Sequence, residues 1–293
     1  MPVTENADRL TPAQVATVEA ITRSAAETDG TYPLAEQFQL RIAAADGEVR
    51  HLLGYLGDEL VGYAQLDLGD PAGAAAEVVV APQARRRGVG TALVTAAHEL
   101  DARLRVWAHG GLSAATALAD HLGYRPVRSL WLMRRPLAGA EPLPEPPPVD
   151  GVEIRTFAPG TDEEAWLRAN ARAFASHPEQ GRMTMADVLA REEASWFDPA
   201  GFFIAWRGDR LAGYHWTKVA EDGVGEVYVL GVDPDEQGTG LGKALLMHGL
   251  THLRDRGLVE VTLYVEADNA PAVALYRKLG FAHAGTDTMY QQP

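Results

Sequence analysis

Two glycine-rich segments have residues suited to binding a phosphate group. They are Arg85-Arg86-Arg87-Gly88-Val89-Gly90 and Gln237-Gly238-Thr239-Gly240-Leu241-Gly242-Lys243, and each stands between an apolar stretch and an amphipathic helical pattern. Backbone N–H groups at the start of a helix bind anions, and glycine lets a phosphate approach the main chain. A P-loop requires Gly at position 237, and a dinucleotide fingerprint requires Gly at position 243. Both patterns are excluded, and pyrophosphate in another setting remains the expected ligand.

The two loops belong to a longer internal repeat. Segments 81–94 and 233–246 match each other, and segments 118–127 and 275–284 match in the same order. Hairpin signatures with Gly57-Asp58 and Gly208-Asp209 at their turns precede the two loops. Two matches in one order indicate a duplicated domain rather than a short-period solenoid.

Length, charge and composition limit the classes of protein. The chain has 293 residues, no Cys and a formal net charge of −14. The length is about twice that of a common domain, and the negative charge argues against binding to nucleic acid or an anionic membrane. Disulfides, thiolate metal sites and a cysteine nucleophile are excluded. The polar N-terminus and the lack of a long apolar segment predict a cytoplasmic protein.

A proline-rich segment predicts the domain boundary. Proline at 142, 144 and 146–148 disfavours a helix and favours an extended linker. We expect domains at 1–137 and 151–293, joined by a linker over 138–150. In each half a helical pattern (10–27 and 162–177) is followed by a hairpin, a strand, the glycine loop with its helix, another strand and another helix. This order predicts an α/β (α+β) layer fold in each half.

The loops fit the pattern Gln/Arg-x-x-Gly-x-Gly/Ala, and each half contains a later helix that ends in Leu-Gly-Tyr or Leu-Gly-Phe. In the second half that helix follows Asn269 and contains Tyr276. In these motifs the chain resembles the GNAT N-acetyltransferases over both halves. The resemblance implies two tandem domains, each with a mixed, mostly antiparallel sheet flanked by helices. It also implies acetyl-CoA as the cosubstrate, with its pyrophosphate at the loop.

The two halves differ at the positions where the chemistry is expected. Amide formation requires a proton acceptor for the amine, stabilisation of the oxyanion and a proton for the departing thiolate. Alignment of the repeats places Ala74 opposite Glu226 and Ala119 opposite Tyr276. We therefore predict that the second half is catalytic, with Glu226 as the general base, directly or through water. Tyr276 is the predicted general acid, and the first half is predicted to be inactive.

The family resemblance also implies the cofactor contacts. A backbone N–H group within Leu230-Gly231-Val232 polarises the thioester carbonyl, and neither a metal nor a covalent enzyme intermediate is required. The nine His residues show no spacing typical of metal ligands. The further contacts implied in the second half are Gln237, Gly238, Thr239, Gly240, Leu241, Gly242, Lys243, Asn269, Ala270, Pro271, Ala272, Val273 and Ala274. Those implied in the first half are Val78, Val79, Val80, Arg86, Arg87, Gly88, Val89, Gly90 and Thr91.

Three further segments resemble a tandem branch of this family. They are Gly225–Val229, Tyr264–Glu266 and His177–Gly181. The acceptor in that branch is the cysteinyl amine of desacetylmycothiol, so the resemblance implies this small molecule and CoA as partners of a monomer. The acceptor contacts that it implies are Glu36, Glu179, Lys218, Glu226 and Tyr264.

Other interpretations of the same residues remain open. The acceptor is alternatively another small amine or a protein N-terminus, because acceptor pockets vary on a shared scaffold. A non-enzymatic alternative makes both halves CoA-binding sensors. Taken singly, Glu226 has the features of a solvated strand carboxylate and Tyr276 those of a core aromatic. The basic run Arg85–Arg87 is equally typical of a solvated surface.

Overall fold

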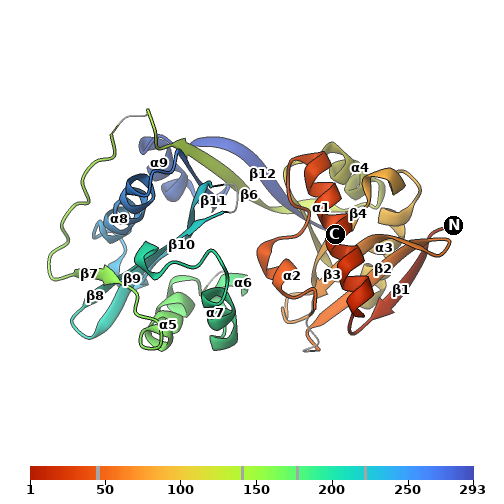
Figure 1. Ribbon diagram of the computed structural model, residues 1–293, viewed down its shortest axis with the longest axis horizontal. Coiled ribbons are helices and arrows are strands. Elements are labelled where there is room, and N and C mark those ends of the chain that lie inside the picture. The colour runs from red at the N-terminus through yellow and green to blue at the C-terminus, as the bar shows by residue number, and fades with distance from the viewer. Residues whose placement is uncertain (44–46, 140–141, 176–177, 221–222) are drawn as a thin grey trace. The chain divides into compact units, whose positions relative to one another are not determined.

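The computed structural model describes residues 1–43, 47–139, 142–175, 178–220 and 223–293. Contacts between Cα atoms divide the chain into two compact units. Unit 1 contains Met1–Trp131, Glu266–Asp268 and Gly285–Pro293, and unit 2 contains Leu132–Val265 and Asn269–Ala284 (Figure 1). We predicted domains that are each continuous in sequence, with boundaries at 137 and 151. In the structure, by contrast, each unit also includes short segments from the other half of the chain.

Unit 1 is a sheet with helices on both faces. Its elements are β1 (Val3–Ala7), α1 (Pro12–Asp29), α2 (Glu36–Leu40), β2 (Val49–Leu56), β3 (Glu59–Asp67), β4 (Ala75–Val80), η1 (Pro82–Ala84), α3 (Val89–Leu100), β5 (Arg105–Ala108), α4 (Ser113–His121) and the start of β6 (Arg125–Pro136). The strand order is β1-β2-β3-β4-β5-β12-β6. Only β4 and β5 pair in parallel among the strand pairs recorded within this unit.

Unit 2 repeats this order. Its elements are β7 (Glu153–Thr156), α5 (Glu163–Ala173), α6 (Pro178–Gly181), α7 (Met185–Glu192), η2 (Pro199–Gly201), β8 (Phe202–Arg207), β9 (Arg210–Val219), β10 (Gly225–Val232), η3 (Pro234–Glu236), α8 (Leu241–Asp255), β11 (Glu260–Glu266), α9 (Ala270–Lys278) and the start of β12 (Ala282–Gln291). The strands are ordered β7-β8-β9-β10-β11-β6-β12. The parallel pair is β10 with β11. The mixed, mostly antiparallel sheet that we predicted for each half is confirmed.

Strands β6 and β12 each contribute to both units. In unit 1 the last strand of the chain, β12, pairs antiparallel with β5, from Thr288 opposite Ala108 to Gln291 opposite Arg105. In unit 2 the end of β6 lies beside β11, where Leu137 N donates to Val259 O at 2.8 Å. Each sheet is therefore completed by a strand from the other half of the sequence.

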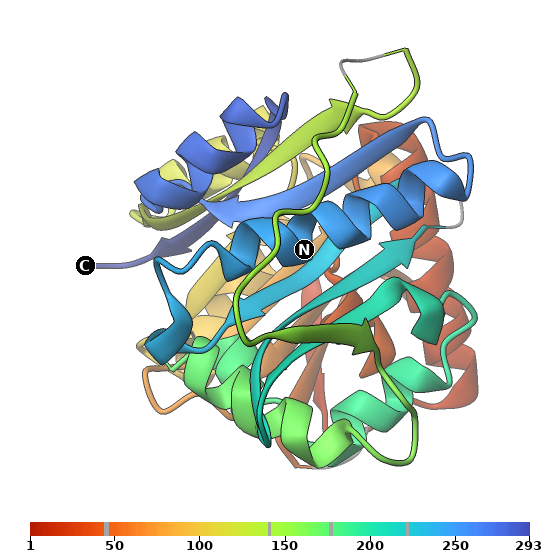
Figure 2. The same ribbon diagram turned by 90° about the vertical axis from the view of Figure 1, so that its left-hand side faces the viewer.

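Alternating residues of β9 face the two helical layers of unit 2. A Cβ at Gly213 would lie 3.0 Å from Leu245 of α8, whereas the ring of Tyr214 packs 5.3 Å from that of Trp166 on α5. Figure 2 shows α8 lying across the near face of the sheet of unit 2. Trp166, Phe202, Tyr214 and Trp216 form an aromatic core on the α5 face. Complete burial of each such side chain contributes about 1.5–3 kcal/mol or more.

The predicted local elements are largely confirmed. Both hairpins turn at the predicted Gly-Asp pairs, where Gly57 and Gly208 have φ values of 64° and 62°. Positive φ at the first loop residue suits glycine in a two-residue hairpin loop. Helix α1 begins after Thr11, which forms a capping box with Gln14. The predicted helix over 162–177 is observed as α5, and residues 176–177 lie outside the described part of the chain.

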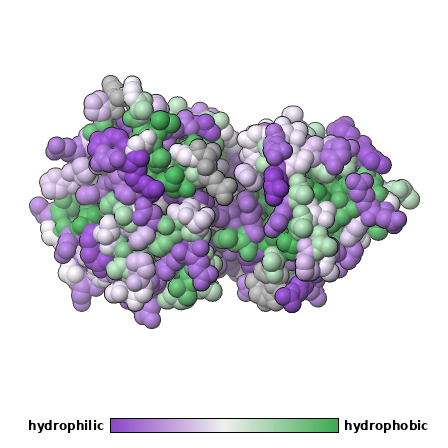
Figure 3. All heavy atoms as spheres, in the orientation of Figure 1, coloured by the Kyte–Doolittle hydropathy of each residue, from purple (hydrophilic) through white to green (hydrophobic). Residues whose placement is uncertain are grey.

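The last two features of the fold concern the distribution of hydropathy on the surface and the length of the apolar helices. Figure 3 shows hydrophilic and hydrophobic residues intermixed over the visible face of each unit. Within the described ranges, no helix is both long enough and apolar enough to cross a membrane.

Candidate active site

The glycine-rich loop of unit 2 leads directly into helix α8. Gly238 and Gly240 have φ values of 80° and 89°, and Gly240 is the N-cap of α8. In the described part of the chain, no protein acceptor is recorded for the backbone N–H groups of Gly242 and Lys243. Those N–H groups, together with the helix dipole, provide a site for an anion such as pyrophosphate.

The strand before this loop separates from its parallel neighbour. Strand β10 pairs with β11 only from Gly225 to Val227, whereas its pairing with β9 continues to Val232. A register shift between Val227 and Val229 marks a bulge in β10. Among the described residues, the β11 side of β10 is thus left without strand pairing from Tyr228 onward. This is where we expected Leu230–Val232 to present backbone N–H groups to a thioester.

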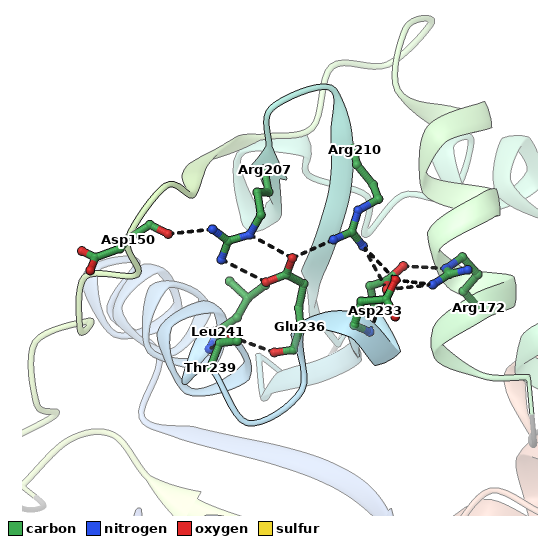
Figure 4. A network of polar contacts seen from close by, with 9 residues as sticks. Asp150, Arg172, Arg207, Arg210, Asp233, Glu236, Thr239 and Leu241 are labelled. Atoms are coloured by element: carbon green, nitrogen blue, oxygen red, sulfur yellow. Dashed lines mark hydrogen bonds and ion pairs between the residues drawn. The ribbon is translucent and has the colours of Figure 1, made fainter.

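Charged residues hold the short turn η3 between that strand and the loop. Arg207 donates to both carboxylate oxygens of Glu236 at 2.9 and 3.0 Å, and Arg210 donates to one of them at 2.7 Å (Figure 4). These pairings lower the pKa of the Glu236 carboxyl. The carbonyl of Glu236 accepts hydrogen bonds from both N and Oγ1 of Thr239. These contacts join the turn to β8, to β9 and to the start of the loop.

Glu226 lies near the separation of the two strands. It is half-buried on β10, directly opposite Lys218 on β9 and beside Thr262 on β11. Residues directly opposite each other in an antiparallel pair share one face, so the side chains of Glu226 and Lys218 project from the same face of the sheet. The Lys218 Nζ lies 4.6 Å from the ring centre of Trp196 and 5.3 Å from that of Tyr228. Aromatic faces attract a cation at these distances.

Tyr276 is buried on α9, behind a cap formed by Asn269. Asn269 Oδ1 accepts a hydrogen bond from Ala272 N at 3.2 Å and thereby starts the helix. Burial raises the pKa of the Tyr276 hydroxyl to about 12. The phenol therefore keeps its proton at neutral pH. No protein partner of this hydroxyl is recorded among the described residues.

Three further predicted acceptor contacts lie on other elements. Tyr264 lies on β11 and is 48% exposed. Glu179 lies in α6, and its side chain is outside the described residues, as is all of His177. Glu36 begins α2 in unit 1. The acceptor roles of Glu36, Glu179 and Tyr264 remain predictions.

Unit 1 contains a cavity of about 880 Å³ at the corresponding place. Its lining includes predicted cofactor contacts, namely Val78–Val80, Arg86 and Gly88–Thr91, and Arg87 is absent from this lining. Strand β4 pairs in parallel with β5 only from Ala75 to Glu77, as in unit 2. Gly88, with a φ of 85°, is the N-cap of α3. The loop, the strand separation and the helix N-terminus are thus present twice.

The groups predicted to act in catalysis are absent from the cavity of unit 1. Ala119 lines this cavity at the position aligned with Tyr276, and Ala74 is a buried alanine at the position aligned with Glu226. Leu112, the N-cap of α4, provides no side-chain cap. His109, which lines this cavity, pairs with Glu77 and Asp287, which lie outside its lining. No cluster able to hold a metal ion is found among the described residues of either unit.

The acetyltransferase (GNAT) family model matches residues 15–124 and 165–281, one stretch in each half. A mycothiol acetyltransferase from Catenulispora acidiphila is 53% identical to the chain, covering 95% of both proteins. The chain belongs to the mycothiol acetyltransferases of the GNAT family. The predicted fold, the tandem repeat and the acetyltransferase class are thereby confirmed.

Solved structures share this fold. A GCN5-related N-acetyltransferase from Sphaerobacter thermophilus is 26% identical, with a TM-score of 0.71, and covers 99% of this chain and 95% of its own. A tandem GNAT protein from the clavulanic acid biosynthesis pathway is 19% identical, with a TM-score of 0.75, and covers 99% and 98%. The tandem fold is therefore shared with proteins of low sequence identity.

Several residues that shape the site were missed by the sequence analysis. Arg191 on α7 donates to the Tyr228 hydroxyl at 2.7 Å, and Trp196 packs against the same ring. Asp233 and Glu236 precede the loop, but carboxylates before a turn are common in surface segments. A bulky aromatic residue within a strand is likewise typical of core packing. The neighbouring sequence therefore contains no signal that would have distinguished these residues from residues that only stabilise the fold.

Proposed function

We propose that unit 2 transfers an acetyl group from acetyl-CoA to the cysteinyl amine of desacetylmycothiol. The nearly full-length relative is named for the mycothiol reaction, which supports this acceptor. The observation that carries the assignment to unit 2 is the position of Glu226 beside the separation of β10 and β11. The aligned position in unit 1 is Ala74, which has no group able to accept a proton.

The proposed reaction assigns one role to each part of the site. The amine nitrogen attacks the thioester carbonyl carbon, and its proton passes to Glu226, directly or through a water molecule. A backbone N–H group within Leu230–Val232 donates to the oxyanion as charge develops. The carbon–sulfur bond then breaks, and Tyr276 donates its proton to the departing sulfur. The proton on Glu226 returns through solvent to Tyr276, so the enzyme is regenerated.

The protonation states at neutral pH allow these roles. An α-amine has a pKa of about 7.7–8.0, so a carboxylate acting through water is an adequate base at neutral pH. The raised pKa of Tyr276 keeps the hydroxyl protonated until the thiolate forms. Positioning of both substrates contributes much of the rate enhancement in such transfers.

The acceptor is proposed to contact Glu36, Glu179, Lys218, Glu226 and Tyr264. Lys218 and Glu226 supply opposite charges on adjacent strands, a suitable arrangement for a polar acceptor with amine and hydroxyl groups. The cavity of unit 1 is proposed to bind CoA through Val78–Val80 and Arg86–Thr91 without catalysing transfer. The Gly88 N-cap and the volume of the cavity support this role.

The test is steady-state release of CoA from acetyl-CoA with desacetylmycothiol and with a panel of other small amines and peptide N-termini. We expect a strong preference for desacetylmycothiol and a loss of about 10²-fold or more in kcat for Glu226→Gln. Turnover with other amines alone would overturn the acceptor. Binding of CoA without any turnover would instead support the sensor alternative.

A further inference from the structure

Helix α5 is tied to the turn before the phosphate-binding loop. Arg172, near the end of α5, donates to both oxygens of Asp233 at 2.7 and 3.1 Å and to Asp235 at 2.9 Å (Figure 4). Asp233 is only 1% exposed, and Arg172 holds the pKa of its carboxyl at about 2. The pair is therefore charged throughout the neutral range, and its two-donor geometry fixes the orientation of both groups.

Unit 1 contains the same connection with the residue types exchanged. There the loop residue Arg85 donates to both oxygens of Asp29, the last residue of α1, at 2.7 and 2.6 Å. Alanine occupies positions 81 and 84, which align with Asp233 and Glu236. A two-donor Arg–Asp pair thus joins the first long helix to the loop segment in both units. The helix supplies the Arg in unit 2 and the Asp in unit 1, and the two pairs use positions that do not align. This recurrence indicates that the connection itself has a function.

The end of α5 also holds the segment that carries Glu179. Asn170, two residues before Arg172, is buried and donates through Nδ2 to Gln180 O at 2.7 Å. Its Oδ1 accepts hydrogen bonds from Gln180 Nε2 at 3.1 Å and from the Tyr214 hydroxyl at 2.6 Å. A Cβ at Gly181 would lie 2.4 Å from Phe174 O, so α6 packs closely on the end of α5. One end of α5 therefore contacts both the loop turn and α6.

We propose that Arg172 is a positioning residue that couples acetyl-CoA binding at the loop to acceptor binding at α6. A pyrophosphate at the first turn of α8 stabilises the loop and the η3 turn in their bound conformation. The turn orients Arg172, and the end of α5 orients Asn170 and hence Pro178–Gly181. Each substrate then raises the affinity of the site for the other, because coupling between two sites is reciprocal.

This inference rests on the proposed acceptor role of Glu179. Its test measures the Kd of desacetylmycothiol by isothermal titration calorimetry on the full chain, first alone and then with saturating CoA. CoA without an acetyl group allows both ligands to bind without turnover. The proposed CoA site of unit 1 is also filled when CoA is present, so the comparison of the Arg172 variants with the unaltered chain separates the coupling through α5 from any effect of that site.

The variants are Arg172→Gln, Arg172→Lys and the matched control Arg155→Lys. Arg155 forms a two-donor pair with Asp162 at 2.7 and 2.8 Å, at the opposite end of α5. Lysine keeps the charge but loses the paired donors. Thermal unfolding of all variants checks that each is folded, and Arg172→Lys keeps the test usable if Arg172→Gln is unstable.

In the unaltered chain we expect the acceptor to bind about 5-fold or more tightly when CoA is present. For both Arg172 variants the ratio should fall to about 1, whereas Arg155→Lys should keep it. A ratio of 1 in the unaltered chain, or a full ratio in folded Arg172 variants, would overturn the coupling. Absence of any turnover of desacetylmycothiol would instead overturn the proposed function, and the coupling with it.

Discussion

His109, one residue after β5, donates from Nδ1 to Asp287 Oδ2 on β12 at 2.8 Å, so the last strand is joined to unit 1 by a buried ion pair. The other ring nitrogen donates to Glu77 on β4 at 3.0 Å. Asp287 also accepts a hydrogen bond from Gly110 N at 2.8 Å. Glu77, His109 and Asp287 therefore connect three strands of one sheet.

Removal of the charge on Asp287 should weaken unit 1. We expect Asp287→Asn to lower the free energy of unfolding by about 3 kcal/mol, because it removes one of the two carboxylates that compensate the charge of His109. Urea denaturation followed by tryptophan fluorescence measures the change. Asp120 is an exposed carboxylate 3.8 Å from Arg125, so Asp120→Asn is the control and should cost less than about 1 kcal/mol. Equal losses in the two variants would contradict the role of the buried cluster.

Two histidines, His109 and His215, should give the stability a maximum near pH 6.5. Burial lowers the pKa of His109, but the charges of Glu77 and Asp287 outweigh burial and raise it to about 10. Burial lowers the pKa of His215 to about 4. The unfolded value for both is about 6.5. Above pH 6.5 folded His109 holds a proton that the unfolded chain releases, so its stabilisation falls and is lost by about pH 10.

Below pH 6.5 the opposite sign applies to His215. The unfolded chain binds a proton that the folded ring excludes, so the stabilisation due to His215 falls as the pH decreases toward 4. NMR titration of the imidazole signals is the direct measurement. His109 should stay protonated and His215 neutral from pH 5.5 to pH 8.5. Titration of either ring within that interval would contradict its assigned environment.

Tyr276→Phe should reduce turnover with little effect on folding. The variant removes only the hydroxyl that is proposed to protonate sulfur, and loss of a general acid costs about 10²-fold or more in kcat. Stopped assays of CoA release measure kcat and the KM for acetyl-CoA, and the KM should change little. Tyr290 lines the cavity of unit 1, so Tyr290→Phe is the control and should keep full turnover. Full activity of Tyr276→Phe would remove this residue from the mechanism.

The two N-cap glycines should separate the functions of the two units. Gly240 and Gly88 have φ values of 89° and 85°, where a side chain costs about 1–2 kcal/mol. We expect Gly240→Ala to raise the KM for acetyl-CoA by about tenfold. Gly88→Ala should leave steady-state kinetics unchanged but weaken one of the two sites in a calorimetric titration with CoA. An equal loss of activity in both variants would contradict catalysis by unit 2 alone.

Local sequence was sufficient to predict the repeat and most of the elements. The Gly-Asp pairs predict hairpin turns because glycine tolerates the positive φ that those turns require. The loop glycines and Asn269 predict where α8 and α9 begin, since both act on the backbone within a few residues. The roles expected for Glu226 and Tyr276 rest on the resemblance to the GNAT family and on the alignment with Ala74 and Ala119, and they remain predictions.

Only the tertiary structure decided which distant residues meet. The sequence of β12 does not show which strand it pairs with. Its observed pairing with β5 is accompanied by contacts such as His109 with Asp287. Arg172 and Asp233 are likewise far apart in the sequence, and they meet because α5 packs on the sheet. Sequence determined the local conformations through φ preferences and hydrophobic periodicity. Long-range pairing was decided by the burial and charge balance of the folded chain, which no local pattern encodes.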